Sequence, residues 1–302
     1  MKKLIATCLV LWWAISFSAS AATLEELMIQ AQKGDAVAQN TIGEMYGKGQ
    51  GVAQNYAEAL KWYRLAGDQR NPNAQYNLGA MYANGLGVTQ SDVKAVRWYR
   101  LAANQGFPMA QHDLGVMYAD GQGVTQSDEV AFKWFLRAAD QGFSAAQYNL
   151  GVMYYRGRGV PLNYAEALKW LRLAGDQGFS MAQYNLGVMY ERGQGVVQNY
   201  MEALKWYRLA ADQGVPNAQF NLGLMYAIGQ GIQENKIISY ALVTLAAASQ
   251  SGSYKIHKVR DDLRMGFSKR DLEMAQALSL EMQKTGNLLS ALDNFQNKSK
   301  GK

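Results

Sequence analysis

The stretch AQYNLGAMYANGLGV, residues 74–88, decides the fold because it recurs at a fixed spacing of 36 residues. Each copy opens with an Ala-Gln pair, and the pairs start without a one-residue slip at Ala38, Ala74, Ala110, Ala146, Ala182 and Ala218. A second block with the same spacing carries a tryptophan, at Trp62, Trp98, Trp134, Trp170 and Trp206. Self-similarity of this period is typical of a solenoid built from stacked supersecondary units.

Hydrophobic periodicity predicts two helices in each unit. In the first block Ala74, Leu78 and Met81 lie at i, i+4 and i+7, on one face of a helix. A Gly-x-Gly motif then ends that helix, because glycine adopts left-handed turn conformations at little cost. In the second block Trp62 and Ala66 share a helical face. Neither helix can bury its apolar face alone, so each unit must stack on the next.

These patterns divide the chain into five segments. We expect an all-α, right-handed α/α solenoid of six helix-turn-helix repeats, with capping helices at both ends. The predicted segments are a signal peptide (1–21), an N-terminal capping helix (22–34), six repeats (35–250), C-terminal capping helices (251–285) and a disordered basic tail (286–302).

The N-terminus has the organisation of a secretory signal. Lys2 and Lys3 precede an apolar run over residues 4–17 and a small-residue segment that predicts cleavage after Ala21. The run is shorter than the roughly 20 residues that span a bilayer, so we expect no transmembrane segment in the mature chain. The only cysteine, Cys8, leaves with the signal. We therefore expect a periplasmic or secreted protein without disulfides.

The AQxxLGxMYxxGxGV block, followed by A-x-x-W and LAADQG, resembles the Sel1-like repeat (SLR), a relative of the tetratricopeptide repeat. The resemblance covers about residues 35–250, and the segment that closes the array is similar to the one found in bacterial members. It implies an α/α superhelix that serves as an adaptor for other proteins and is often exported in bacteria. Some members clamp each unit with a disulfide, which the mature chain, having no cysteine, does not share.

The sequence is poor in catalytic groups. The mature chain has two histidines, His112 and His257, and no HExxH, GxSxG or cysteine–histidine pattern. The glycines at 47–51 follow a predicted helix and recur in every unit, which indicates a turn rather than a phosphate loop. We therefore predict no enzyme activity, no cofactor and no metal site.

The basic composition, with a pI near 9.2, does not indicate nucleic-acid binding. Many basic residues have acidic residues at helical spacing, and such pairs largely neutralise the charge on a helix face. The predicted pairs include Arg64–Asp68, Arg172–Asp176 and Arg208–Asp212.

The first helices are the better candidate for binding. If the units pack as tetratricopeptide repeats do, these helices line the concave face and present large aromatic side chains flanked by amides. Such rings and amides suit the capture of a peptide or protein. The predicted partner-binding residues are Tyr76, His112, Asp113, Tyr148, Tyr155, Tyr184, Glu191 and Phe220.

Three alternatives stay open. The tyrosines and asparagines at these positions also fit a repeat consensus that packs between adjacent first helices. The aromatic row would equally suit a glycan or a peptidoglycan fragment, and His112 or His257 would be the candidates in a weak hydrolase. We expect a monomeric, non-catalytic interaction scaffold, and the sequence names neither its partner nor its cellular process.

Overall fold

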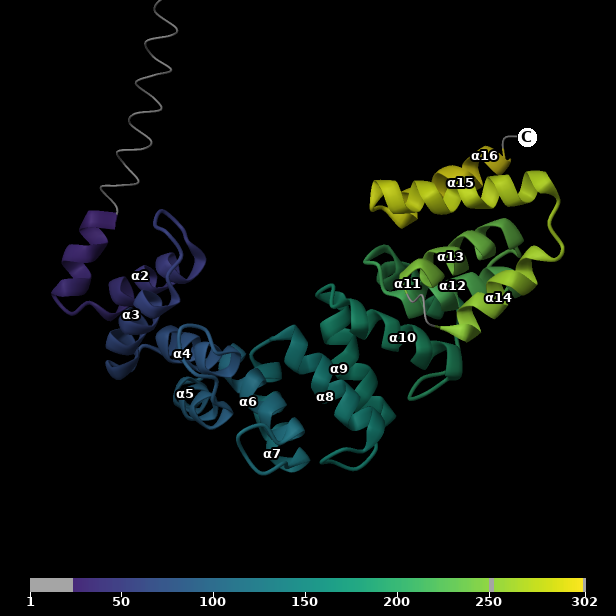
Figure 1. The fold of residues 1–302 in the computed structure, drawn as a ribbon. Coiled ribbons are helices and arrows are strands. Elements are labelled where there is room, and N and C mark those ends of the chain that lie inside the picture. The colour runs from purple at the N-terminus through teal and green to yellow at the C-terminus, as the bar shows by residue number, and fades with distance from the viewer. Residues whose placement is uncertain (1–23, 250–252, 301–302) are drawn as a thin grey trace, which may run out of the picture. The chain divides into compact units, whose positions relative to one another are not determined.

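The computed structural model describes residues 24–249 and 253–300, and every regular element in these ranges is an α-helix (Figure 1). The predicted signal peptide lies outside the described residues. The chain forms two compact units, residues 1–143 and 144–302, which hold repeats one to three and four to six respectively. None of the described helices is both long enough and apolar enough to cross a bilayer.

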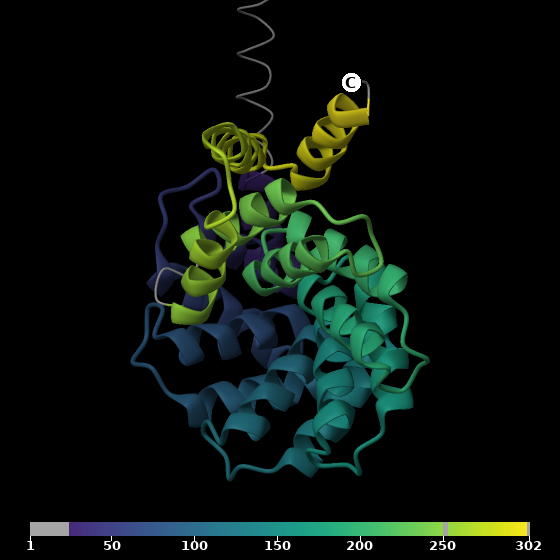
Figure 2. The same ribbon diagram turned by 90° about the vertical axis from the view of Figure 1, so that its right-hand side faces the viewer.

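The prediction of six helix pairs is confirmed. Each repeat consists of a first helix (A helix) and a second helix (B helix), and consecutive pairs stack in chain order within each unit (Figures 1 and 2). The A helices are α2 (Ala36–Lys48), α4 (Pro72–Asn84), α6 (Pro108–Asp120), α8 (Ser144–Arg156), α10 (Ser180–Arg192) and α12 (Pro216–Ile228). The B helices are α3 (Tyr56–Asp68), α5 (Asp92–Asn104), α7 (Asp128–Asp140), α9 (Tyr164–Asp176), α11 (Tyr200–Asp212) and α13 (Lys236–Ser249).

Local sequence explains where these helices begin and end. In α4, Asn71 caps the first turn by accepting from the Ala74 amide, and Pro72 stands at the first helical position, where a missing N–H costs nothing. Gly85 ends the helix in the left-handed conformation, with φ of 67°. Asn55 caps α3 in the same way as Asn71 caps α4.

A glycine in each A helix lets the two helices of a repeat approach closely. A Cβ added at Gly79 would lie 2.4 Å from the Tyr99 ring, and one at Gly187 would lie 2.5 Å from the Tyr207 ring. Both distances are shorter than any van der Waals contact. The ring of the B helix therefore packs directly on the backbone of the A helix.

Buried glutamines join one repeat to the next. Gln75 is only 3% exposed; its amide donates to the Gly67 carbonyl over 2.9 Å and its oxygen accepts from Gln105 over 2.7 Å. Such pairing satisfies polar atoms that would be costly to bury alone. The pairs that share this geometry are Gln39–Gln69, Gln75–Gln105, Gln111–Gln141, Gln147–Gln177 and Gln183–Gln213.

The sixth repeat breaks this series. Ser249 stands where the second glutamine of the pair would be, 30 residues after Gln219. The buried side-chain oxygen of Gln219 consequently has no hydrogen-bond partner among the described residues.

Helices outside the repeats cover both ends. Residues 24–32 form a helix whose Ala31 is buried beside Ile42, where a capping helix was predicted over 22–34. After the last repeat come α14 (Tyr254–Arg264) and α15 (Lys269–Thr285). Ser268 caps α15, and a capping box with Asp271 completes the turn.

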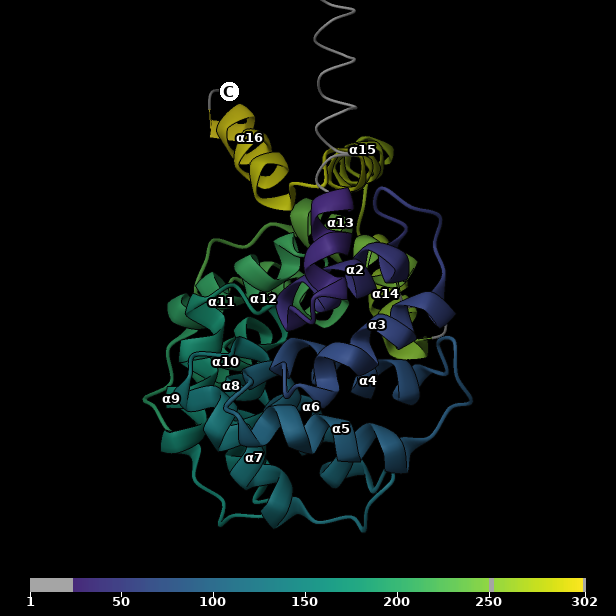
Figure 3. The same cartoon turned by 90° about the vertical axis from the view of Figure 1, so that its left-hand side faces the viewer.

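The prediction of a disordered tail over residues 286–302 is wrong for most of that segment. Residues Leu288–Lys300 form a further helix, α16, which packs on α11 and α15 of the second unit (Figure 3). The reason is an apolar face that burial stabilises: Leu288, Ala291 and Leu292 are each at most 3% exposed. The polar residues that follow in the sequence concealed this short amphipathic pattern.

Candidate partner-binding surface

The predicted aromatic row lies half-buried rather than fully outward. In the first unit the Tyr76 ring packs between Tyr99 of its own B helix and Phe107, with ring centroids 5.5 and 5.3 Å apart. His112 occupies the same position one repeat later, between Phe135 and Phe143. Each ring therefore contacts its own B helix and the residue that precedes the next A helix.

The second unit shows the same arrangement. Tyr148 packs on Phe179 with ring centroids 5.0 Å apart, and Tyr184 packs on Tyr207 at 6.0 Å. These contacts are structural, so packing between helices explains part of the row. Tyr76, His112, Tyr148 and Tyr184 all keep an accessible edge, because each remains partly exposed.

Phe220 departs from the prediction. Its ring is only 5% exposed and belongs to an apolar cluster with Val243 and Ile256. The Lys255 ammonium lies 5.5 Å from the ring centroid. Because α14 packs at this position, the Phe220 ring offers no surface to a partner in this structure.

Asp113 is the polar centre of the surface in the first unit. Its Oδ1 lies 2.8 Å from Nδ1 of His112. Burial, and then the nearby Asp113 carboxylate, raise the pKa of Tyr76 to about 12. The same two causes raise the pKa of Tyr99. The Tyr76 hydroxyl thus serves as a hydrogen-bond donor to the Asp113 carboxylate.

A cavity opens beside Asp113. Its volume is about 300 Å³, and it lies between the second and third repeats of the first unit. Amides and carboxylates dominate the lining, which suits hydrogen bonding to a peptide backbone or a cationic group. The lining residues are Ala83, Asn84, Gln90, Asp92, Tyr99, Asp113, Val116, Met117 and Gln122.

The second unit contains a hydrogen-bonded network around Tyr207. The Tyr207 hydroxyl donates to Glu191 over 2.5 Å and accepts from the Asn221 amide over 3.1 Å. Burial, and then Glu191, raise the pKa of Tyr207. Tyr155 lies half-buried near this network, and its hydroxyl donates to the Gln194 side chain over 2.9 Å.

The structure therefore groups the predicted residues by unit. It brings together Tyr76, His112 and Asp113 in the first, and it places Tyr184 and Glu191 around Tyr207 in the second. The sequence analysis missed Tyr99 and Tyr207, which lie on B helices. Aromatic residues recur at their position every 36 residues, but such a pattern is also expected of core residues. Tyr99 and Tyr207 are core residues that also contact the predicted binding residues.

Nothing in the described residues forms a metal site, since they contain no group of three or more potential metal ligands. His112 belongs to the first unit and His257 to the second. The Nδ1 of His257 lies 2.8 Å from the Ser253 carbonyl within its own helix.

Comparison with known families decides the assignment. The Sel1 repeat model matches six consecutive segments, residues 36–71, 72–107, 108–143, 144–179, 180–215 and 216–251. The chain belongs to the Sel1 repeat family. Proteins of this family generally mediate protein–protein interactions, and the repeat fold is typically a non-catalytic scaffold. No curated relative matches the sequence.

One solved structure supports the same family, and two more distant ones are also similar to this chain. A Sel1 repeat protein from Oxalobacter formigenes is 32% identical, with a TM-score of 0.65 over 75% of this chain and 96% of the other. The protective antigen c5321 of uropathogenic Escherichia coli is 24% identical, with a TM-score of 0.48 over 91% and 81% of the two chains. The immunity protein Pa5087 of Pseudomonas aeruginosa is 22% identical, with a TM-score of 0.42 over 72% and 83%.

Proposed function

We propose that this Sel1 repeat protein is an exported, non-catalytic scaffold that binds a partner protein or peptide along its A helices, the predicted concave face. The observation that carries the proposal is the pairing of phenols with carboxylates: the half-buried Tyr76 pairs with Asp113, and the buried Tyr207 pairs with the partly exposed Glu191. Rings and carboxylates fixed by packing lose little entropy on binding, which favours recognition.

The chemistry of this surface favours a peptide over a glycan. Carboxylates and amides that line a cavity of about 300 Å³ can accept and donate hydrogen bonds along a main chain and can hold a basic side chain. Sugar binding by stacking needs an open ring face, and two neighbouring aromatic rings contact the Tyr76 ring in the first unit.

Photo-crosslinking tests the binding surface. A photoreactive phenylalanine at position 148 or 184 of the mature chain should capture one partner from the native envelope, and purified partner should then bind with measurable affinity. Changing Tyr148 and Tyr184 together to Ala should reduce that affinity more than tenfold, about 1.4 kcal/mol. Circular dichroism first establishes that the variant folds.

A matched control lies on the loops. Leu162 and Val197 are 54% and 85% exposed and lie in the loops that follow α8 and α10, outside the helices themselves. Their double change to Ala should leave the affinity unchanged. The proposal fails if the loop variant loses binding while the folded tyrosine variant keeps it. Titration with muropeptides in place of the partner separates the glycan alternative.

Export is tested separately. The charged, apolar and small-residue segments of residues 1–21 support a cleaved signal. Mass spectrometry of the native protein should find an N-terminus at or near Ala22. An intact Met1 on the native protein would overturn this part of the proposal.

A further inference from the structure

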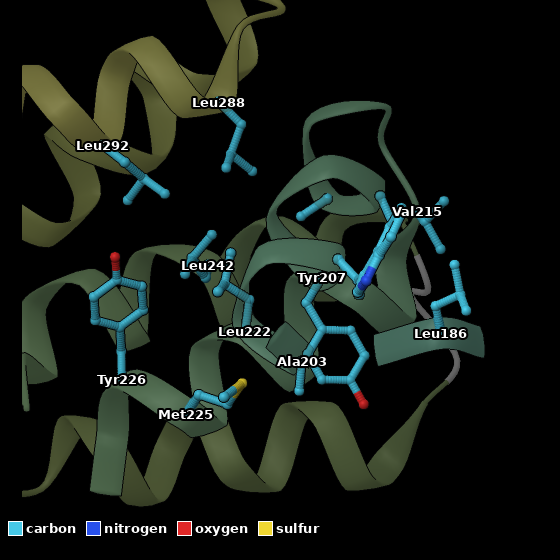
Figure 4. Packing of buried hydrophobic residues seen from close by; sticks show 14 of the residues in the cluster. Leu186, Ala203, Tyr207, Val215, Leu222, Met225, Tyr226, Leu242, Leu288 and Leu292 are labelled. Atoms are coloured by element: carbon cyan, nitrogen blue, oxygen red, sulfur yellow. The ribbon is translucent and has the colours of Figure 1, made fainter. Parts of the chain in front are cut away.

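The helix α16 is seated on the repeat array by apolar contacts. Leu288, Ala291 and Leu292 join the main apolar cluster of the second unit. Leu288 and Leu292 point from α16 toward Leu242 and Tyr226 (Figure 4). The face of α16 thus resembles the i, i+3, i+4 pattern by which amphipathic helices bind grooves.

Three polar contacts fix its position. The first turn of α16 is held by a backbone amide that bonds to a carboxylate of α11, and the middle of the helix by an ion pair and an amide–hydroxyl bond. The contacts are Leu289 N to Asp212 Oδ1 (3.0 Å), Arg208 Nη2 to Asp293 Oδ1 (2.8 Å) and Gln296 Nε2 to the Tyr226 hydroxyl (3.1 Å). We call Arg208, Leu209, Asp212 and Tyr226 the helix seat.

The same seat recurs in other repeats. Arg208 donates to the hydroxyl of Tyr226, 18 residues later on the next A helix. Equivalent guanidinium–hydroxyl bonds join the B helix to the next A helix at the other seats. At Arg64 and Arg172 the guanidinium thus bonds to a tyrosine rather than to the aspartate expected from the sequence. These bonds join Arg64 to Tyr82 (2.6 Å), Arg100 to Tyr118 (2.7 Å) and Arg172 to Tyr190 (3.0 Å).

These other seats are open. Leu65, Leu101 and Leu173 are 50%, 47% and 43% exposed. Leu209, the equivalent leucine in the seat that α16 covers, is half-buried against the cluster that contains Leu288. The arginines differ in the same way. Arg64, Arg100 and Arg172 are exposed, whereas Arg208, which α16 covers, has a side chain that is only 22% exposed.

The third repeat lacks the seat. Its sequence reads Leu136-Arg137 where the others read Arg-Leu. The Arg137 guanidinium instead lies 4.6 Å from the Trp134 ring centroid. The chain therefore contains its own matched control.

We propose that the open seats on α3 and α9 bind an amphipathic helix of a partner protein that carries the chemistry of α16. That chemistry is two leucines one turn apart, an acidic residue for the seat arginine, and an exposed first-turn amide for the seat aspartate. Arg64, Leu65 and Asp68 form one such seat, and the corresponding residues on α9 form the other. The α5 seat has Asn104 in place of the aspartate and binds the same helix more weakly.

This surface is separate from the A-helix surface described above, because it lies on the B helices. Two features of the α16 seat are missing at the open seats. There α15 supplies Leu278 and Met282 to the cluster, and the chain itself tethers α16. A free helix therefore binds the open seats less tightly than α16 binds its own seat.

A peptide with the sequence of residues 286–300 is the probe, with a photoreactive phenylalanine at position 295. It is mixed with the full mature chain, and cross-linked residues are mapped by mass spectrometry. Cross-links should fall on α3 and α9 and not on α7. The double variant Arg172→Ala with Leu173→Ala should reduce cross-linking to α9 at least about tenfold and leave α3 unchanged.

Two controls make the outcome decisive. A peptide with Leu288→Asp and Leu292→Asp should give no specific cross-links, and circular dichroism should show the chain variants folded. The proposal is overturned if the peptide does not bind, if it labels α7 as strongly as α9, or if it labels α11 alone by displacing α16.

Discussion

The side-chain amide of Gln213 donates to the side-chain oxygen of Gln183 over 2.8 Å, and so joins the end of α11 to α10 within the fifth repeat. Gln183 is 4% exposed and in turn donates to the Gly175 carbonyl over 3.0 Å. One buried side chain thus satisfies polar atoms of two repeats. The stability of the array should depend on such residues as much as on its apolar core.

Changing Gln183 to Leu should therefore destabilise the protein by about 2 kcal/mol or more, since it leaves the Gly175 carbonyl without its partner in a buried site. Gln219→Leu is the matched comparison. It removes a bond to the Ala211 carbonyl but also a buried oxygen that has no partner among the described residues, so its cost should be about 1 kcal/mol smaller. Urea unfolding measures both, and equal losses would argue against the pairing.

The backbone of Arg70 is strained. It has φ of 66°, and five equivalent positions, Gly34, Gly106, Gly142, Gly178 and Gly214, hold glycine with positive φ. A side chain in this conformation costs about 1–2 kcal/mol, which replacement by glycine would recover. Glycine also makes the unfolded chain more flexible, and this entropy offsets about 0.5–1 kcal/mol of the recovered stability. Arg70→Gly should thus stabilise the protein by about 0.5–1 kcal/mol. A lower melting temperature would contradict this expectation, and Gly106→Arg should show the opposite sign.

The buried phenols predict a loss of stability in alkali. Tyr76 has a pKa of about 12 in the folded chain against an ordinary value of 10, so the unfolded chain releases this proton first as the pH rises. Its contribution is fully present below pH 10 and is lost between pH 10 and about 12. Urea midpoints measured from pH 9 to 11.5 should fall, and Tyr76→Phe should make the fall less steep. A variant with the unchanged slope would exclude Tyr76 as a contributor.

The C-terminal helix should behave as part of the fold. Leu292 is fully buried, so Leu292→Ala should cost about 2–4 kcal/mol. In a stack of nearest neighbours the loss should appear first at the end of the array. Hydrogen exchange should therefore accelerate in α16 and α15 and change least in α8. Uniform exchange across the second unit would contradict this local response.

Much of the fold could be predicted from the sequence, because the repeat exposes each residue type at a fixed position six times. The period located the two helices of every repeat. The tail was mispredicted since Leu288, Ala291 and Leu292 form a single short pattern that no repeat reinforces. Burial against α11, a contact distant in the sequence, stabilises that helix.

The candidate surface was less predictable. Helical periodicity places Tyr76 and Tyr184 on the A-helix face, but it does not show how far a neighbouring ring covers them. Contacts to Tyr99 and Tyr207 on the B helices decide that, and they depend on the close approach that Gly79 and Gly187 permit. Phe220 illustrates the limit, since α14 buries it and has no counterpart in the other repeats.

The second glycine of the Gly-x-Gly turns that follow α4, α6, α10 and α12 also limits how such an array can change. A Cβ at Gly87 would lie 2.7 Å from the Tyr56 backbone, and one at Gly195 would lie 2.5 Å from the Tyr164 carbonyl. The turn of one repeat thus rests on the start of the preceding B helix. Inserting or deleting residues in these loops would break the contact between repeats. Evolution and protein engineering must therefore alter specificity by substitution on helix faces, and must alter length by adding or removing complete 36-residue units.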